Sequence, residues 1–141
     1  MKLSIIIPVL NEAAAVVPTL EHLQALRLRG HQVIVADGGS SDASAGLAAP
    51  LADRVIESAR GRARQMNAGA ANANGDVLLF LHADTRLPPR ADDAVILAMD
   101  RHDWGRFDVR IEGGSALLAI VAFFMNWRSR LSGIATGDQA I

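Results

Sequence analysis

Three short, mostly apolar runs without polar alternation constrain the fold more than any other feature of this sequence. They cover residues 3–7, 33–36 and 77–81. A strand with one face in water alternates apolar and polar side chains, so continuous runs indicate strands covered on both faces. A shorter strand is expected at 54–56. With helical segments between the strands, this order predicts a single α/β domain over residues 1–141, with a mostly parallel sheet flanked by helices.

The helices between the strands are predicted from apolar periodicity and from terminal signals. The first follows Asn11, its expected N-cap, and stops at Gly30. Pro18 lies inside this pattern and should kink the helix or mark the start of its main segment. Two further helices are expected at residues 43–49 and 62–73.

The longest apolar stretch covers residues 116–125. It is shorter than the roughly 18 residues that a membrane-spanning helix needs. A helix buried in the core is the favoured interpretation. The alternative is an interfacial helix in peripheral contact with the inner face of a membrane.

Composition excludes several classes of function. The net charge is −1, so no basic surface for nucleic acid is expected. The chain has no cysteine, which excludes disulfides, thiolate zinc sites and cysteine nucleophiles and favours the cytoplasm. Lys2 is the one lysine, which leaves almost no place for the lysine of a phosphate loop.

Polar residues follow three of the predicted strands. Asn11 and Glu12 follow the first, DGGSSD at 37–42 follows the second, and His82 and Asp84 end the last. Ligands of open parallel sheets bind beyond the carboxyl ends of the strands, so these loops are expected to share one binding edge.

Each loop also has a purely structural interpretation. Asn11 could serve only as a helix cap, and DGGSSD has the composition of an ordinary turn. Asp37 favours a functional role, because it directly follows an apolar strand. It also precedes Gly38 and Gly39, which would let a ligand approach the backbone.

His82 and Asp84 are predicted to hold a divalent cation. Residues two apart in a strand project to the same face, so both side chains could reach one ion across Ala83. A carboxylate suits Mg²⁺ or Mn²⁺, and an imidazole partner favours Mn²⁺. The alternative is that His82 bonds within the protein and Asp84 caps the turn before the two prolines.

Arg60, Arg62 and Arg64 stand at the start of the helix predicted at 62–73. A helix N-terminus and arginine guanidinium groups both favour phosphate oxygens, which predicts a diphosphate site. The alternative is a solvated basic turn that pairs with Asp53 or Glu57. A dinucleotide fingerprint is absent from PVLNE, the segment after the first strand, which disfavours a Rossmann dehydrogenase.

Four segments together resemble a known family. They read SIIIPVLNE, VIVADGGSSDAS, GRARQMNAGAANANGDVLLFLHADT and GDQAI. In this order they are similar to the family-2 glycosyltransferases of the GT-A fold, and in particular to a bacterial branch in which His-Ala-Asp replaces Asp-x-Asp. The resemblance covers nearly the whole chain. It departs where many relatives have an arginine and this chain has Met66.

The resemblance implies transfer of a sugar from a nucleotide-diphospho-sugar to a lipid, glycan or small-molecule acceptor, assisted by Mn²⁺ or Mg²⁺. Asp37 would bind the base or ribose, Asp84 the metal, and Arg62 or Arg64 the diphosphate. The implied donor-binding residues are Pro8, Asn11, Glu12, Asp37, Gly38, Arg62, Arg64 and His82.

The expected catalytic residues are Asp84 and Asp138. Asp138 lies in a glycine-flanked loop and is expected near the donor phosphates or the acceptor rather than as the base. The resemblance implies that the chain stops before the family's presumed base. Two alternatives are a donor-binding module without transfer and a nucleotidyltransferase, although PVLNE lacks the glycine-rich basic loop that the latter normally carries.

Overall fold

The structure is a computed structural model that describes residues 1–108, 110–111 and 116–132. The described part contains a four-stranded sheet in which every strand pair is parallel, which confirms the predicted fold class. In the order β3-β2-β1-β4, the strands are β3 (Arg54–Glu57), β2 (Gln32–Asp37), β1 (Leu3–Val9) and β4 (Val77–Phe80).

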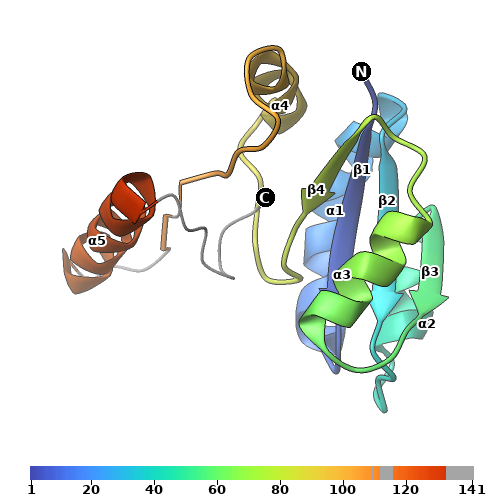
Figure 1. Ribbon diagram of the computed structural model, residues 1–141. Helices are drawn as coiled ribbons and strands as arrows, with labels where there is room; N and C mark the ends of the chain where they lie inside the picture. The colour runs from blue at the N-terminus through green and yellow to red at the C-terminus, as the bar shows by residue number, and fades with distance from the viewer. Residues whose placement is uncertain (109, 112–115, 133–141) are drawn as a thin grey trace.

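Helices cover both faces of the central strands β1 and β2 (Figure 1), as their apolar runs predict. The same prediction is wrong for β4, where Leu78 is 38% exposed. In the view of Figure 1, α3 lies in front of the sheet and α1 and α2 lie behind it. The helices of the described part are α1 (Ala13–Leu28), α2 (Ser44–Ala48), α3 (Arg62–Ala71), α4 (Ala91–Met99) and α5 (Ala116–Ser132).

Alternate residues of β1 face the two helical layers. Ile5 and Ile7 belong to the buried core cluster that α1 completes with Val16 and Leu20. Ile6 faces α3, where a Cβ added at Gly69 would lie 2.3 Å from the Cγ2 atom of Ile6. The absence of a side chain at Gly69 therefore lets α3 pack closely on the central strand.

One prediction about α1 is wrong in detail. The helix begins at Ala13, with Glu12 at the N-cap position, so Asn11 is not the cap. Asn11 instead has φ of 56°, a left-handed conformation that asparagine tolerates better than most residues. Pro18 lies inside α1, as predicted, so of its two alternatives the start of the helix is excluded. Gly30 ends the helix as predicted, with φ of 90° and its N–H donating to the carbonyl of Arg27.

The structure places α4 and α5 on the β4 side of the sheet (Figure 1). The interpretation of residues 116–125 as a buried core helix is wrong, because Phe123 and Phe124 are 63% and 57% exposed. Hydrophobicity shows that a segment avoids water but does not show which surface covers it. No helix in the described residues is long and apolar enough to cross a bilayer.

Candidate functional site

The carboxyl ends of the strands form one edge of the sheet, and the loops after β1 and β2 are joined there by hydrogen bonds. The N–H of Asn11 donates to Ser40 Oγ at 2.9 Å, and Asn11 Oδ1 accepts from the N–H of Ser41 at 2.8 Å. Asn11 and Ser41 are both exposed. The structure thus brings two of the predicted loops together, with Asn11 as the residue that joins them.

The same loop caps α1 from outside the helix. Ser44 Oγ accepts from the N–H of Glu12 at 2.8 Å, and Asp42 Oδ2 accepts from the N–H of Ala13 at 3.2 Å. The hydroxyl and N–H of Ser44, both donating to Asp42, lower the pKa of that carboxyl below its usual value. Because these two N–H groups of the N-terminus of α1 already have acceptors, they do not offer a phosphate site.

Asp37 is buried and holds its own loop in shape. Its Oδ2 atom accepts from the N–H groups of Gly39 and Ser40 at 3.1 and 3.0 Å, and its Oδ1 atom accepts from the Ser40 hydroxyl. A carboxylate has about four acceptor positions, so these three bonds leave roughly one for a ligand. Gly39 has φ of 86°, which favours glycine at this turn.

Gly38 makes a close contact inside the protein that was not predicted, and its predicted contact with a ligand stays a prediction. A Cβ at this position would lie 2.9 Å from Cδ of Gln65, so the missing side chain leaves room for a protein residue. Gln65 is buried, and its Nε2 atom donates to the carbonyls of Val9 and Ala36 at 2.7 and 2.9 Å. It therefore bridges the ends of β1 and β2. Nothing in the arginine-rich segment around Gln65 indicated this contact.

Pro8 lies half-buried near the end of β1, opposite Ala36 of β2. The carbonyl of Ile6 accepts from the N–H of Leu81, just past the end of β4. The backbone of Pro8, two residues farther along β1, is turned toward the same side of the strand as that of Ile6. At Pro8, however, β4 no longer runs beside β1. A proline is tolerated at this point because no ladder hydrogen bond needs its missing N–H.

The arginines lie where they were predicted. α3 begins at Arg62 and follows Gly61, which has φ of 129°, and Arg60, Arg62 and Arg64 are all exposed. Asp53, one of the alternative partners, instead forms an ion pair with Arg27 at 2.9 Å. Guanidinium groups at the N-terminus of α3 fit an anionic ligand.

The shared strand face predicted for His82 and Asp84 is wrong. β4 ends at Phe80, and the N–H of Thr85 donates to the carbonyl of His82 at 3.1 Å, so residues 82–85 form a turn. Asp84 is exposed on this turn, and Thr85 Oγ1 donates to its Oδ1 atom at 3.4 Å. The alternation of a strand therefore does not apply to these two residues.

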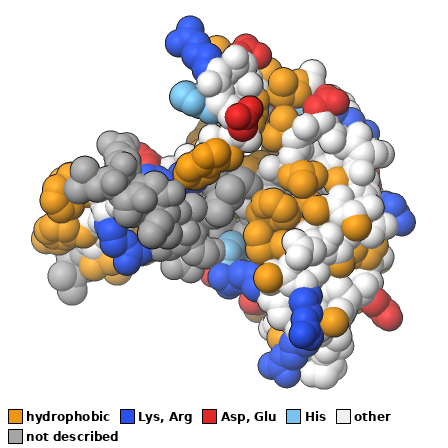
Figure 2. Space-filling model, in the orientation of Figure 1, with side chains coloured by type: hydrophobic (Ala, Val, Ile, Leu, Met, Phe, Trp, Pro, Cys, Tyr) orange, Lys and Arg blue, Asp and Glu red, His pale blue; other side chains and the backbone are white. Residues whose placement is uncertain are grey.

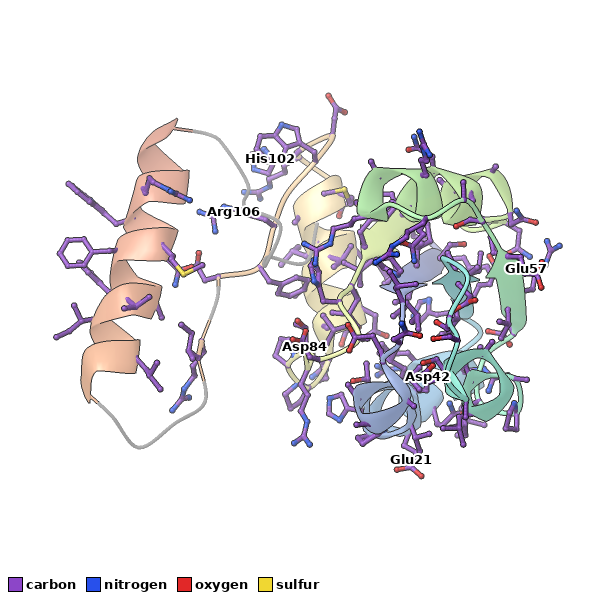
Figure 3. The ribbon with its side chains drawn as sticks, turned by 90° about the horizontal axis from the view of Figure 1, so that it is seen from below. Glu21, Asp42, Glu57, Asp84, His102 and Arg106 are labelled. Carbon is purple, nitrogen blue, oxygen red and sulfur yellow. The ribbon has the colours of Figure 1, made fainter. Side chains whose placement is uncertain are left out.

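Two contacts with α1 fix the segment that carries Asp84. The hydroxyl of Thr19 donates to the carbonyl of Ala83, and Nε2 of His22 lies 2.9 Å from the carbonyl of Leu87. Figure 3 views the molecule from below, onto the carboxyl edge, and shows Asp84 at this edge together with Asp42. Thr19 and His22 were not predicted, because their partners lie more than 60 residues away in the sequence.

The side chains at the carboxyl edge decide how a divalent cation could be held there. No group of three or more His, Asp or Glu side chains among the described residues is arranged to hold one. A cation bound to a diphosphate, however, needs only one or two carboxylates, because phosphate oxygens and water complete its coordination. Asp84 fits this requirement. Asp138 lies outside the described residues.

A separate cavity of about 510 Å³ lies between β4 and α4. Apolar side chains such as Leu79, Val95 and Trp104 line it, with Asp76, Asp103 and Arg106 also contributing. None of the predicted donor-binding residues lines this cavity, so it is distinct from the carboxyl edge.

A parallel α/β sheet with polar loops at its carboxyl edge defines a ligand-binding domain of the nucleotide-binding type. The model of one family, glycosyl transferase family 2, matches residues 4–116. Because this match covers most of the chain, the chain belongs to glycosyl transferase family 2. A comparison with curated proteins found no match.

Solved structures with a similar fold include three sugar transferases. Mannosyl-3-phosphoglycerate synthase from Rubrobacter xylanophilus is 28% identical, with a TM-score of 0.56 over 64% of this chain and 33% of its own. A mannosyltransferase from Pyrobaculum calidifontis, in complex with GDP-Man and Mn²⁺, is 21% identical, with a TM-score of 0.61 over 72% of this chain and 33% of its own.

The third is glucosyl-3-phosphoglycerate synthase from Mycobacterium tuberculosis, in complex with Mn²⁺, UDP and glucosyl-3-phosphoglycerate. It is 20% identical, with a TM-score of 0.53 over 60% of this chain and 35% of its own. These likenesses support the GT-A-like fold. The present chain spans about a third of the length of each of these three proteins.

Proposed function

We propose that this chain binds a nucleotide-diphospho-sugar at the carboxyl edge of its sheet and takes part in transferring the hexose to an acceptor. The observation that carries the proposal is the hydrogen-bonded junction of the loops after β1 and β2 through Asn11, at the edge where Asp84 is exposed. Family membership supports the proposal. The His-Ala-Asp sequence at 82–84 supports placement in the branch that has this motif.

In this proposal the donor is bound along the edge. The nucleoside lies against Pro8, Asn11 and Glu12 and takes the remaining acceptor position of Asp37. Arg62 and Arg64 bind the diphosphate, because their exposed guanidinium groups stand at the N-terminus of α3. Gly38 contributes indirectly, by giving Gln65 room to hold the strand ends.

Asp84, with His82 on the same turn, would hold a divalent cation on the donor. Mn²⁺ or Mg²⁺ bound there would supply positive charge next to the leaving nucleoside diphosphate. Arg62 and Arg64 would stabilise the same negative charge of the leaving nucleoside diphosphate. Groups of this kind contribute most to the rate when the charge develops in the transition state. We place Asp138 near the donor phosphates or the acceptor.

The family match argues against the nucleotidyltransferase alternative. Donor binding without transfer is the second candidate. The acceptor is a lipid, a glycan or a small molecule. The lack of cysteine fits a reducing compartment, so the cytoplasm is the proposed location.

Calorimetry with UDP-glucose and GDP-mannose, each with Mn²⁺ and with a chelator, tests donor binding. The proposal predicts metal-dependent binding of at least one donor. An assay for released nucleoside diphosphate in the presence of candidate acceptors then separates the two candidates, because release requires transfer or hydrolysis. Absence of donor binding under every condition would contradict both.

A further inference from the structure

The side-chain amide of Gln65 is hydrogen-bonded at its nitrogen end only. Its Nε2 atom donates to the carbonyls of Val9 and Ala36 at 2.7 and 2.9 Å. Because a carbonyl can only accept, these contacts fix which end of the amide is nitrogen, and Oε1 is the other end. Among the residues that the structure describes, none donates a hydrogen bond to Oε1. Gln65 is 4% exposed, so bulk water has little access to this oxygen.

Two other glutamines of the described part show the ordinary arrangement. Gln24 also donates from Nε2 to two carbonyls, but its Oε1 atom accepts from Nη1 of Arg27 at 2.9 Å. Oε1 of Gln32 accepts from the hydroxyl of Ser4 and from the N–H of Asn74. Buried acceptors are normally paired in this way, because an unpaired one is costly. A buried oxygen that no protein group satisfies is therefore a contact point for a ligand or for a bound water.

Gln65 lies at the carboxyl edge of the sheet. It belongs to the first turns of α3, which begins at this edge, and helical side chains lean toward the N-terminus of their helix. Oε1 is 3.1 Å from the position that a Cβ of Gly38 would take, so it lies against the turn that contains Asp37. Asp37 itself has about one acceptor position left. Two groups that can still accept hydrogen bonds therefore lie next to Gly38.

Such acceptors select the part of a nucleotide that presents donors. An ionised diphosphate offers only oxygen acceptors, so it does not match them. The arginines that suit the diphosphate, Arg62 and Arg64, are exposed. Figure 2 shows positively charged side chains in the lower part of the view, where α3 begins, whereas Gln65 is buried beneath the surface. A nucleoside carries hydroxyl groups on its ribose and N–H groups on its base, and both kinds of group can donate to Oε1.

We propose that Oε1 of Gln65 accepts a hydrogen bond from the nucleoside of the donor, either from a ribose hydroxyl or from a base N–H group. Gln65 then has two roles. Its Nε2 atom holds the ends of β1 and β2 together, and its Oε1 atom recognises the nucleoside bound over them. Gly38 serves both roles, because a side chain there would meet the amide. This inference rests on the proposed function, since it names one contact of the donor at the same edge.

A substitution that keeps the donor end of the side chain and removes the acceptor tests this contact. In Gln65→Lys, the ammonium group can donate to the carbonyls of Val9 and Ala36 but cannot accept a hydrogen bond. The probe is UDP or GDP, whichever binds the parent chain more tightly. It is compared by calorimetry with its 2′-deoxy analogue, its 3′-deoxy analogue and the analogue methylated at the ring N–H of the base.

At least one analogue should bind the parent about fivefold more weakly than the unmodified nucleotide, the factor that one neutral hydrogen bond supplies. The same analogue and the unmodified nucleotide should bind Gln65→Lys equally. This ratio removes the effect of the added charge on the diphosphate, which both ligands share. Gln24→Lys, the same exchange at a glutamine whose Oε1 has a protein donor, should keep the ratio of the parent. The analogue that shows this pattern identifies ribose or base as the source of the hydrogen bond.

A measurement on the unchanged chain decides the matter if Gln65→Lys does not fold. In the parent labelled with ¹³C, the Cδ resonance of Gln65 should shift when the nucleotide binds. The shift should be smaller with the analogue that binds more weakly. The Cδ resonance of Gln24 should not move, because its oxygen already accepts from Arg27.

Several results would overturn the proposal. Equal binding of all analogues by the parent is one, and a ratio as large in Gln65→Lys as in the parent is another. A Gln65 resonance that does not respond to the nucleotide would assign Oε1 to a bound water, and a shift produced by Mg²⁺ alone would assign it to a cation. If the parent binds neither UDP nor GDP, the proposed function itself fails, and this contact fails with it.

Discussion

Asn11 and Gln65 show how single residues shape the candidate site without belonging to a recognisable catalytic motif. Asn11 joins the loops after β1 and β2. Gln65 of α3 holds the ends of the same two strands together by donating to the carbonyls of Val9 and Ala36. Both contacts link segments at least 29 residues apart. The edge is therefore held in place before any ligand binds.

Replacing Gln65 with leucine should weaken both the fold and the site. The change removes two hydrogen bonds to buried backbone carbonyls, and loss of buried partners costs about 1–3 kcal/mol. We expect urea unfolding to show a loss in this range and calorimetry to show weaker donor binding. Asn67→Ala, an exposed change on the same helix, should alter neither. Unchanged stability in the leucine variant would show that the bridge contributes nothing.

At the scale of elements, a buried cluster ties α4 to the amino end of the sheet. Asp92 of α4 accepts from Arg29 Nη2 at 2.7 Å, and its Oδ2 atom lies 3.1 Å from Nε2 of His31. Nδ1 of His31 accepts from the N–H of Leu3 at 3.1 Å, so Nε2 carries a proton and donates to Asp92. The cluster thereby joins α4 to β1 and to the start of β2.

This cluster predicts an acid-dependent loss of stability. Burial alone would raise the pKa of Asp92, but the His31 hydrogen bond, the N–H of Asp93 and the charge of Arg29 together lower it below the usual 3.8. Because the pKa of Asp92 is lower in the folded state than in the unfolded state, its carboxylate contributes fully to the free energy of unfolding above about pH 4. This contribution is lost as the pH falls through the folded-state pKa.

Asp92→Asn should therefore be less stable than the parent by about 1–3 kcal/mol at neutral pH. The difference in unfolding free energy between the parent and Asp92→Asn should become smaller as the pH falls below 3.8, the ordinary pKa of an aspartate. Urea denaturation between pH 7 and pH 3 measures both effects. Asp93→Asn, which breaks an exposed pair with Arg90, serves as the control. A difference that stays constant over the whole range would contradict the assignment.

The start of α3 gives a second prediction at this scale. If Arg62 and Arg64 bind the diphosphate, replacing both with alanine should weaken UDP binding at least tenfold and uridine binding hardly at all. Competition or calorimetry with the two ligands measures the difference. Arg54→Ala with Arg101→Ala removes two exposed charges elsewhere and should leave UDP binding unchanged. Equal losses for UDP and uridine would indicate a structural role for the pair.

For the molecule as a whole, the sequence predicted the sheet better than its surroundings. The strands could be predicted because residues such as Ile5 and Val35 are buried between two layers of helices. A strand buried in this way has apolar side chains on both faces, which gives a continuous apolar run in the sequence. The exposure of α5 was not predicted, because composition cannot tell a buried helix from one whose apolar face is open. α4 was also not anticipated.

The site was predicted in outline for a related reason. Parallel strands bring their carboxyl ends to one edge, so the convergence of the loops followed from topology alone. The details depend on long-range contacts that no local pattern contains. Asn11 bonds to Ser41 rather than capping α1, and the turn after β4 replaces the strand assumed for His82 and Asp84.

Binding of a nucleotide-diphospho-sugar at the carboxyl edge, with a divalent cation held by Asp84, is the proposal on which the function of this chain depends. The most direct test is calorimetric titration of UDP-glucose and GDP-mannose into the parent chain, Asp84→Asn and Asp100→Asn, each with saturating Mn²⁺ and with a chelator. Asp100 is an exposed aspartate at the end of α4 and is a matched control. Asp84→Asn preserves size and removes one charge, and the exposed position of Asp84 predicts a nearly unchanged melting temperature.

We expect Mn²⁺ to tighten donor binding at least tenfold in the parent and in Asp100→Asn, and to have little effect in Asp84→Asn. A metal effect as large in Asp84→Asn as in the parent would show that Asp84 does not hold the cation.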